Sequence, residues 1–111
     1  MKKETPVQSD TEYAKALGAA LRAERKKQKI GVELAGKALG ITASYISQIE
    51  NGKKNPTLSV IENYAGFLGM DLFELSLRVR IIRSPDKESL QNLIADLTSK
   101  IDTLAELRTA G

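Results

Sequence analysis

The sequence predicts an all-α protein, made of five short helices followed by a longer C-terminal helix. Apolar residues recur every three or four positions through most of residues 11–108, which is the periodicity of helices with one buried face. Gly40, Gly52 and Gly69 directly follow three of these segments, at the position where glycine commonly ends a helix. One segment, residues 77–82, has a different pattern and is predicted as a short strand.

The first five helices are placed by their apolar stripes and caps. They are expected at residues 11–28, at residues 32–39, at residues 42–51 behind a threonine N-cap, from about Thr57, and at MDLFELS. The apolar residues expected to face the core of the first four helices are Tyr13, Leu17, Ala20, Leu21, Leu34, Ala35, Ala38, Leu39, Ile46, Ile49, Leu58, Ile61, Tyr64, Ala65 and Leu68.

Residues 77–82 allow two interpretations. Apolar residues at Leu75, Leu77, Val79 and Ile81 alternate with polar ones, which is strand periodicity. A lone strand needs a partner, and a second copy of the chain could supply its edge. The alternative is that the segment prolongs the fifth helix.

A further helix is predicted at residues 85–108. Ser84 is its expected N-cap, Pro85 its first residue, and acidic residues follow in the first turn. Isoleucine and leucine alternate at the a and d positions of about two heptads, which is typical of parallel two-stranded coiled coils. We therefore expect a dimerisation helix; the alternative is a helix folded onto its own core. The predicted dimerisation residues are Leu90, Leu93, Ile94, Leu97, Ile101 and Leu104.

The expected organisation has three parts. Residues 1–10 form a disordered tail, residues 11–76 a five-helix domain, and residues 77–111 a dimerisation segment. The start MKKETPVQSD lacks the apolar run of a secretory signal, and no run reaches the roughly 18 apolar residues of a membrane helix. We therefore expect a cytoplasmic protein that does not contact a membrane.

Composition limits the function classes. The 111 residues include no cysteine and no histidine, so disulfides, thiolate metal sites and the commonest general base are excluded. The spacing of the glycines fits neither a dinucleotide-binding loop nor a P-loop. We expect neither an enzyme nor a bound cofactor, metal or small-molecule ligand.

Charge is unevenly distributed along the chain. Residues 22–54 hold eight lysines and arginines against three glutamates, a net charge of +5, whereas residues 84–111 carry −2. A basic middle indicates a polyanionic partner, although a solvated lysine-rich surface is an equally good explanation of charge alone.

Two short helices with Gly40 between them predict a helix-turn-helix. In the second helix, TASYISQIEN, the outer positions hold small or hydrogen-bonding residues that fit a major groove about 12 Å wide. Gln48 can pair with adenine, serine with either base type, and alanine with a thymine methyl. Gly52, Lys53 and Lys54 then place cations and open backbone amides where phosphates would run. An amphipathic helix followed by a solvated lysine loop would have the same pattern.

Residues 17–75 resemble the lambda-repressor-like, Cro-type helix-turn-helix family. The matching pieces are LR (21–22) together with Arg25, LGIT (39–42), SYIS (44–47), IENG (49–52), PTL (56–58) and LGMDL (68–72). The resemblance implies a five-helix fold in which the third helix reads double-stranded DNA. It implies base contacts from Ala43, Ser44, Ser47 and Gln48, phosphate contacts from Arg22, Tyr45, Asn51, Lys53 and Lys54, and a structural ion pair between Arg25 and Glu50.

The second helix departs from the family pattern. Gly31 and Val32 stand where members commonly have Ser or Thr followed by Gln, so a side-chain cap and a phosphate-contacting glutamine are missing. The backbone amides of Gly31 and Val32 could still serve a phosphate. Gly36 replaces a usual alanine, which lowers helix propensity by up to about 1 kcal/mol.

The leading hypothesis is a homodimeric, sequence-specific DNA-binding transcription regulator, most simply a repressor of a near-palindromic operator. A second hypothesis is an interaction protein, such as an antitoxin, whose C-terminal helix docks a different protein. A third is an adaptor with a helix-turn-helix body that binds no DNA.

Overall fold

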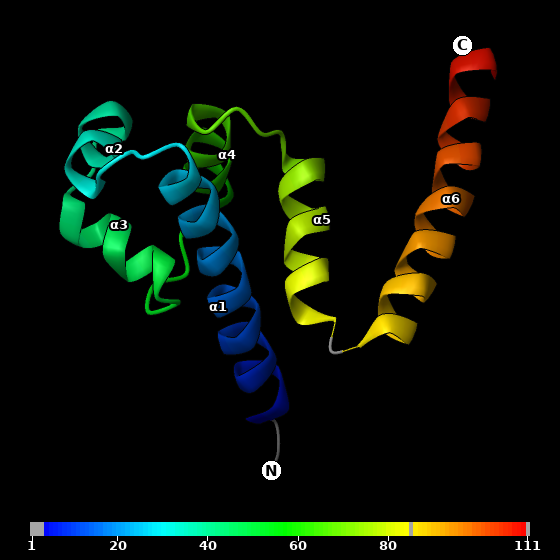
Figure 1. Cartoon of the computed structure of the whole chain (residues 1–111), viewed down its shortest axis with the longest axis horizontal. Coiled ribbons are helices and arrows are strands. Elements are labelled where there is room, and N and C mark those ends of the chain that lie inside the picture. The colour runs from blue at the N-terminus through cyan, green and yellow to red at the C-terminus, as the bar shows by residue number, and fades with distance from the viewer. Residues whose placement is uncertain (1–3, 85, 111) are drawn as a thin grey trace. The chain divides into compact units, whose positions relative to one another are not determined.

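The structure is a computed structural model that describes residues 4–84 and 86–110, with side chains described for residues 12–109 within those ranges. The described residues form six helices and no strand (Figure 1). The helices are α1 (Glu4–Lys27), α2 (Val32–Leu39), α3 (Ala43–Glu50), α4 (Leu58–Phe67), α5 (Leu72–Arg83) and α6 (Lys87–Ala110). The all-α fold predicted from the sequence is therefore confirmed.

The chain divides into two compact units, Met1–Val79 and Arg80–Gly111. The core of the first unit is built from apolar faces of α1, α3, α4 and α5. Its largest fully buried side chains are Leu21, Ile46, Ile49, Tyr64, Leu75 and Val79. Smaller residues of α1 and α2, among them Ala20 and Ala35, fill the same cluster.

Two glycines allow helices of the first unit to approach closely. A Cβ atom at Gly18 of α1 would lie 2.6 Å from the carbonyl oxygen of Glu50 and closer still to that of Ile49. A Cβ atom at Gly36 of α2 would lie 2.6 Å from the carbonyl oxygen of Ile41. Glycine is therefore needed at position 36 despite its low helix propensity, because an alanine there would collide with the turn that leads into α3.

Four of the predicted core residues are on the surface: Tyr13, Leu34, Ala38 and Leu58. Leu34 is 57% exposed and Leu58 is 65% exposed. On α2 the small pair Ala35 and Gly36 occupies the contact side, which leaves Leu34 facing outward. Leu58 is the first residue of α4, and side chains point back toward the helix N-terminus, where no turn covers it.

The predicted strand at residues 77–82 is wrong, because this segment lies within α5. Leu75 and Val79 are four residues apart and both buried, so the alternating pattern also satisfies a helix. Arg78 supports the helical form with ion pairs at 2.8 Å to Glu74, one turn earlier, and to Glu24 of α1.

The first residues of α1 and of α6 differ from the prediction. Residues 4–10 are helical rather than a tail, and Pro6 lies in the first turn of α1, where its missing N–H costs no hydrogen bond. Residues 1–3 of the predicted tail lie outside the described residues. The N-cap of α6 is Asp86, which accepts a hydrogen bond from the Ser89 amide at 2.8 Å. Ser84 instead donates to the Arg80 carbonyl at 2.8 Å, and Pro85 lies outside the described residues.

Candidate DNA-binding interface

Helix α3 is short and fixed at both ends. The Thr42 hydroxyl accepts a hydrogen bond from the Tyr45 amide at 3.0 Å, which caps the first turn as predicted. At the other end Gly52 has a φ of 72°, a left-handed conformation suited to glycine. The Lys53 amide donates to the Gln48 carbonyl at 2.8 Å and closes the turn.

The inner and outer faces of α3 carry different chemistry. Ile46, Ile49 and Glu50 are buried. The predicted base-contacting residues lie on the other side: Ser44 is exposed, and Ala43, Ser47 and Gln48 are half-buried. The predicted base-contacting side chains thus present two hydroxyls, one carboxamide and one methyl group, which are small enough for a DNA groove. Tyr45 is the other half-buried side chain of α3.

The predicted phosphate-contacting residues fall into two groups. Arg22, Gly31, Asn51, Lys53 and Lys54 are exposed. Tyr45 and Val32 are half-buried and pack against the core, so each side chain has a structural contact as well. Gly31 is the N-cap of α2 and has no side chain that could accept a hydrogen bond. The first backbone amides of α2 therefore have no side-chain acceptor at this cap.

A buried polar network holds α3 in place. Arg25 donates from Nε and Nη2 to the two carboxylate oxygens of Glu50, at 2.7 and 2.9 Å. Its Nη1 donates to the Ile30 carbonyl at 2.5 Å. Tyr64 of α4 donates a short hydrogen bond to Glu50 Oε2. Arg25 and Glu50 are 7% and 6% exposed, so the network lies inside the protein.

The network raises the pKa of two of its members, Arg25 and Tyr64. The hydrogen bond with Glu50 raises the pKa of Arg25, against the opposing effect of burial. Burial, followed by the hydrogen bond and charge of Glu50, raises the pKa of Tyr64 well above its ordinary value. Glu50 is the last residue of α3, so the network joins α3 to both α1 and α4.

A second polar network joins α1 to α5. Gln28 donates to Glu24 at 2.8 Å and to the Leu68 carbonyl at 2.7 Å, while Arg78 donates to Glu24 at 2.8 Å. The hydrogen bonds from Gln28 and Arg78, with the charges of Arg78 and Lys27, lower the pKa of Glu24. This side of α1 is therefore occupied by intramolecular partners. The contact between Arg78 and Glu24 has no local signal in the sequence, because the two residues are 54 positions apart.

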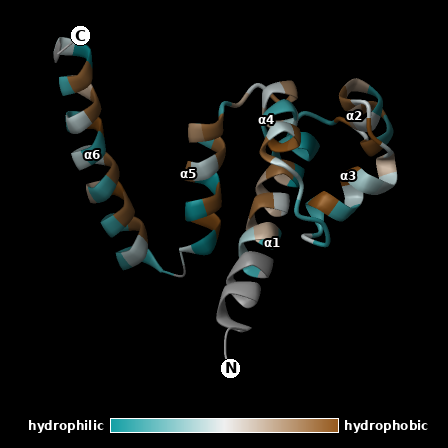
Figure 2. Cartoon of the chain, turned by 180° about the vertical axis from the view of Figure 1, so that it is seen from behind, coloured by the Kyte–Doolittle hydropathy of each residue, from teal (hydrophilic) through white to brown (hydrophobic). Residues whose placement is uncertain are grey.

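The second unit contains the other predicted site, the dimerisation residues of α6. Leu93 is 5% exposed and already covered within this single chain, and Leu90 and Leu97 are half-buried. The apolar residues that remain exposed are Ile94 at 62%, Ile101 at 59%, Leu104 at 53% and Leu107 at 64%. Apolar residues recur along the whole of α6 (Figure 2), so its stripe continues beyond the part that the chain itself covers.

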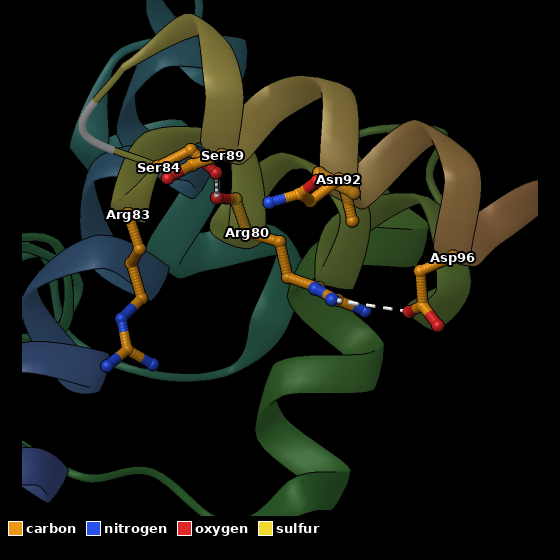
Figure 3. Close-up of a pocket in the computed structure, with 7 residues that line it drawn as sticks. Arg80, Arg83, Ser84, Ser89, Asn92 and Asp96 are labelled. Carbon is orange, nitrogen blue, oxygen red and sulfur yellow. Dashed lines mark hydrogen bonds and ion pairs between the residues drawn. The ribbon is translucent and has the colours of Figure 1, made fainter.

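The second unit also has an open cavity of about 570 Å³, lined by Arg80, Arg83, Ser84, Ser89, Asn92, Leu93 and Asp96 (Figure 3). Arg80 approaches Asp96 at 3.4 Å, and Lys100 approaches the same carboxylate at 2.5 Å. These contacts, the one from Lys100 first, lower the pKa of Asp96. The charges in this cavity are thus largely matched within the unit. The sequence did not predict the cavity.

Two kinds of feature are absent from the residues that the structure describes. None of their helices is long and apolar enough to cross a membrane. They contain no group of three or more acidic, histidine or cysteine side chains that could hold a metal ion.

The sequence and structure were compared with known proteins. A family profile described as Helix-turn-helix matches residues 21–75. The ImmF control region 10 kDa protein of Bacillus phage phi105 is 33% identical over 63 residues, which cover 57% of this chain and 70% of that protein. The immunity repressor protein of the same phage is 29% identical over 89 residues, which cover 79% of this chain and 61% of the repressor.

Two crystal structures of the clp gene regulator ClgR from Corynebacterium glutamicum have a similar fold. One has a TM-score of 0.59 and 24% identity, covering 60% of this chain and 86% of ClgR. The other has a TM-score of 0.61 and 22% identity, covering 81% and 90%. The profile match and the phage relatives identify the family, and the arrangement of α2 and α3 agrees with it. The chain belongs to the lambda-repressor-like helix-turn-helix family of DNA-binding transcription regulators.

Proposed function

We propose that this protein is a repressor that binds a near-palindromic DNA operator as a homodimer and reads it with α3 in the major groove. The observation that carries the proposal is the division of α3 into a buried apolar face and an accessible face of small polar side chains. Such a helix can enter a groove about 12 Å wide without displacing its own core contacts.

The accessible face of α3 predicts the type of base readout. Gln48 can donate to and accept from one adenine, and Ser44 and Ser47 can pair with either base type. Ala43 can contact a thymine methyl group. Because α3 has no arginine or asparagine in its first turn, direct contacts are few, and the shape of the operator contributes to specificity.

The turns around α3 supply the contacts that fix its register on DNA. Asn51, Lys53 and Lys54 follow the helix directly and are exposed. Gly31 presents the uncapped start of α2, whose amides and dipole suit a phosphate. Such contacts position the protein without reading sequence, so they are expected to contribute similarly on all DNA.

The exposed stripe of α6 supports the homodimer. Ile94, Ile101 and Leu104 follow the a and d spacing of a two-stranded coiled coil and remain accessible in the single chain. A symmetric pair would place two copies of α3 in successive major grooves, with half-sites about 34–36 Å apart. The name of the phage relative, immunity repressor protein, supports repression as the regulatory outcome.

A second candidate function is an interaction module, such as an antitoxin, whose α6 docks a different protein. The same exposed stripe favours it, because Ile94, Ile101, Leu104 and Leu107 would suit an apolar groove on another chain. The homodimer is preferred, because the heptad spacing of the stripe allows α6 to pack against α6 of a second copy of the chain. Co-expression that yields a stoichiometric complex with a different protein, and no homodimer, would favour the module.

The proposed function is tested by selection from a random duplex DNA pool. Enrichment of an inverted repeat, with half-sites about one helical turn apart, is the expected result. The enriched duplex should be bound with a steep inverse dependence on salt. A pool without enrichment, or binding that does not depend on salt, would contradict the proposal.

A further inference from the structure

Helix α1 comes very close to the turn that follows α3. A Cβ atom placed on Gly52 would lie 2.6 Å from Lys15 Cγ and 2.8 Å from Lys15 Cα. The backbone of α1 at Lys15 therefore lies against the turn that carries Lys53 and Lys54. Lys15 is exposed, and its four-carbon stem begins at this contact. Lys15, which is distant in sequence, thus lies beside the turn that carries Lys53 and Lys54.

Most of the cationic side chains that the structure describes in the first unit have no ion pair, and the lysines near Gly52 are among them. Arg25 and Arg78 are held by Glu50, Glu24 and Glu74. Lys15, Lys53 and Lys54 have no ion pair with any acidic side chain in the part of the chain that the structure describes. Like charges held together repel one another, so a cluster of this kind is stabilised when a polyanion adds the missing negative charge.

The cluster is continuous with another predicted phosphate contact. Gly18 is three residues after Lys15 and packs against the carbonyl oxygens of Ile49 and Glu50, so this stripe of α1 follows the end of α3. Arg22 is seven residues after Lys15, two helical turns along the same stripe, and is exposed. Lys15 and Arg22 therefore lie roughly 10 Å apart along one side of α1.

We propose that Lys15 contacts a DNA phosphate together with Lys53 and Lys54, so that α1 and the turn after α3 form one clamp on the DNA backbone. This inference rests on the proposed function, because it assigns a further contact at the same interface. It adds a residue from outside the helix-turn-helix, on a helix whose other side is occupied by the Glu24 and Arg78 network.

The test compares variants of the full chain on the selected duplex and on random duplex DNA, across a range of salt concentrations. Lys15→Met removes the charge and keeps most of the stem that packs on Gly52, whereas Lys15→Arg keeps the charge. Lys27→Ala is the matched control, since it removes one exposed lysine from the side of α1 near Glu24. Circular dichroism establishes that each variant is folded.

Because the homodimer loses one phosphate contact per protomer, Lys15→Met is expected to reduce the slope of log affinity against log salt by about 1.8. It should weaken the binding of both duplexes about sixtyfold at 0.1 M salt. Lys15→Arg and Lys27→Ala should keep the wild-type slope. If the wild type has a steep slope and Lys15→Met leaves it unchanged, Lys15 is not at the interface, although the proposed function stands. If the wild type itself lacks salt-dependent binding, the proposed function fails as well.

Discussion

Tyr64 donates a hydrogen bond to Glu50, the last residue of α3, and so connects this helix to α4. The carboxylate that accepts this bond is already held by two nitrogens of Arg25 from α1. A buried carboxylate needs such partners, because an unpaired charge inside a protein is strongly destabilising. The orientation of α3 therefore depends on three side chains from three helices.

Removal of the Tyr64 hydroxyl is predicted to destabilise the first unit. Tyr64→Phe keeps the buried ring and leaves Glu50 with one partner fewer, which should lower the free energy of unfolding by about 1.5–3 kcal/mol. Urea unfolding measures the change. Tyr13→Phe is the control, because Tyr13 is 42% exposed and its hydroxyl is expected to contribute less. Equal losses in the two variants would contradict the role given to Tyr64.

The same hydroxyl predicts a loss of stability at high pH. Burial, with the hydrogen bond to Glu50, raises the pKa of Tyr64 in the folded protein above its ordinary value of about 10. The resulting stabilisation is complete below about pH 10 and is lost as the pH rises from there toward the folded-state pKa, because the unfolded chain then binds fewer protons.

The free energy of unfolding should therefore fall above pH 10 by up to about 1.4 kcal/mol per pH unit more in the wild type than in Tyr64→Phe. Any other pH dependence of stability in this range is common to both proteins and cancels in the comparison. Parallel curves for the two proteins would show that Tyr64 does not carry this dependence.

Gly18 is predicted to be essential for the packing of α1 on α3. In Gly18→Ala the added Cβ would meet backbone carbonyl atoms of Ile49 and Glu50, which cannot rotate away, and overpacking should cost about 1–3 kcal/mol. Gly66→Ala is the matched control, because nothing lies within 4 Å of its added Cβ. That change should stabilise α4 by up to about 1 kcal/mol. Thermal unfolding of both variants checks the opposite signs.

The homodimer is predicted to depend on the exposed stripe of α6. Ile101→Asp would place a charge in an apolar seam and should convert the dimer to a monomer, as measured by light scattering coupled to size-exclusion chromatography. Ser99→Asp adds the same charge on the opposite side of the helix and should leave the mass unchanged. A dimeric Ile101→Asp variant would show that α6 is not the seam.

Local signals predicted much of the fold. The bounds of α2 are as predicted, and Thr42, Gly40 and Gly52 mark the ends of α2 and α3 as expected. These positions depend on caps and backbone conformation, which are set by residues within a few positions of one another. The outward residues of α3 followed from the same short-range pattern.

Contacts between residues that are distant in the sequence could not be predicted from local patterns. Arg78 favours the helical form of α5 through Glu24, 54 residues away, and a local alternation could not reveal that partner. Tyr64 was expected only as an apolar core residue, since its acceptor lies 14 residues away. Lys15 reaches the turn after α3 only because α1 and α3 pack at Gly18.

The central claim, that the accessible face of α3 reads DNA bases, is tested most directly by Gln48→Ala. The affinities of wild type and variant are measured on the selected duplex and on random duplex DNA at one salt concentration. The selected duplex should lose roughly 1–3 kcal/mol of binding free energy for each half-site, while random DNA changes little. Equal losses on the two duplexes, or none on either, would show that α3 does not read the operator through Gln48.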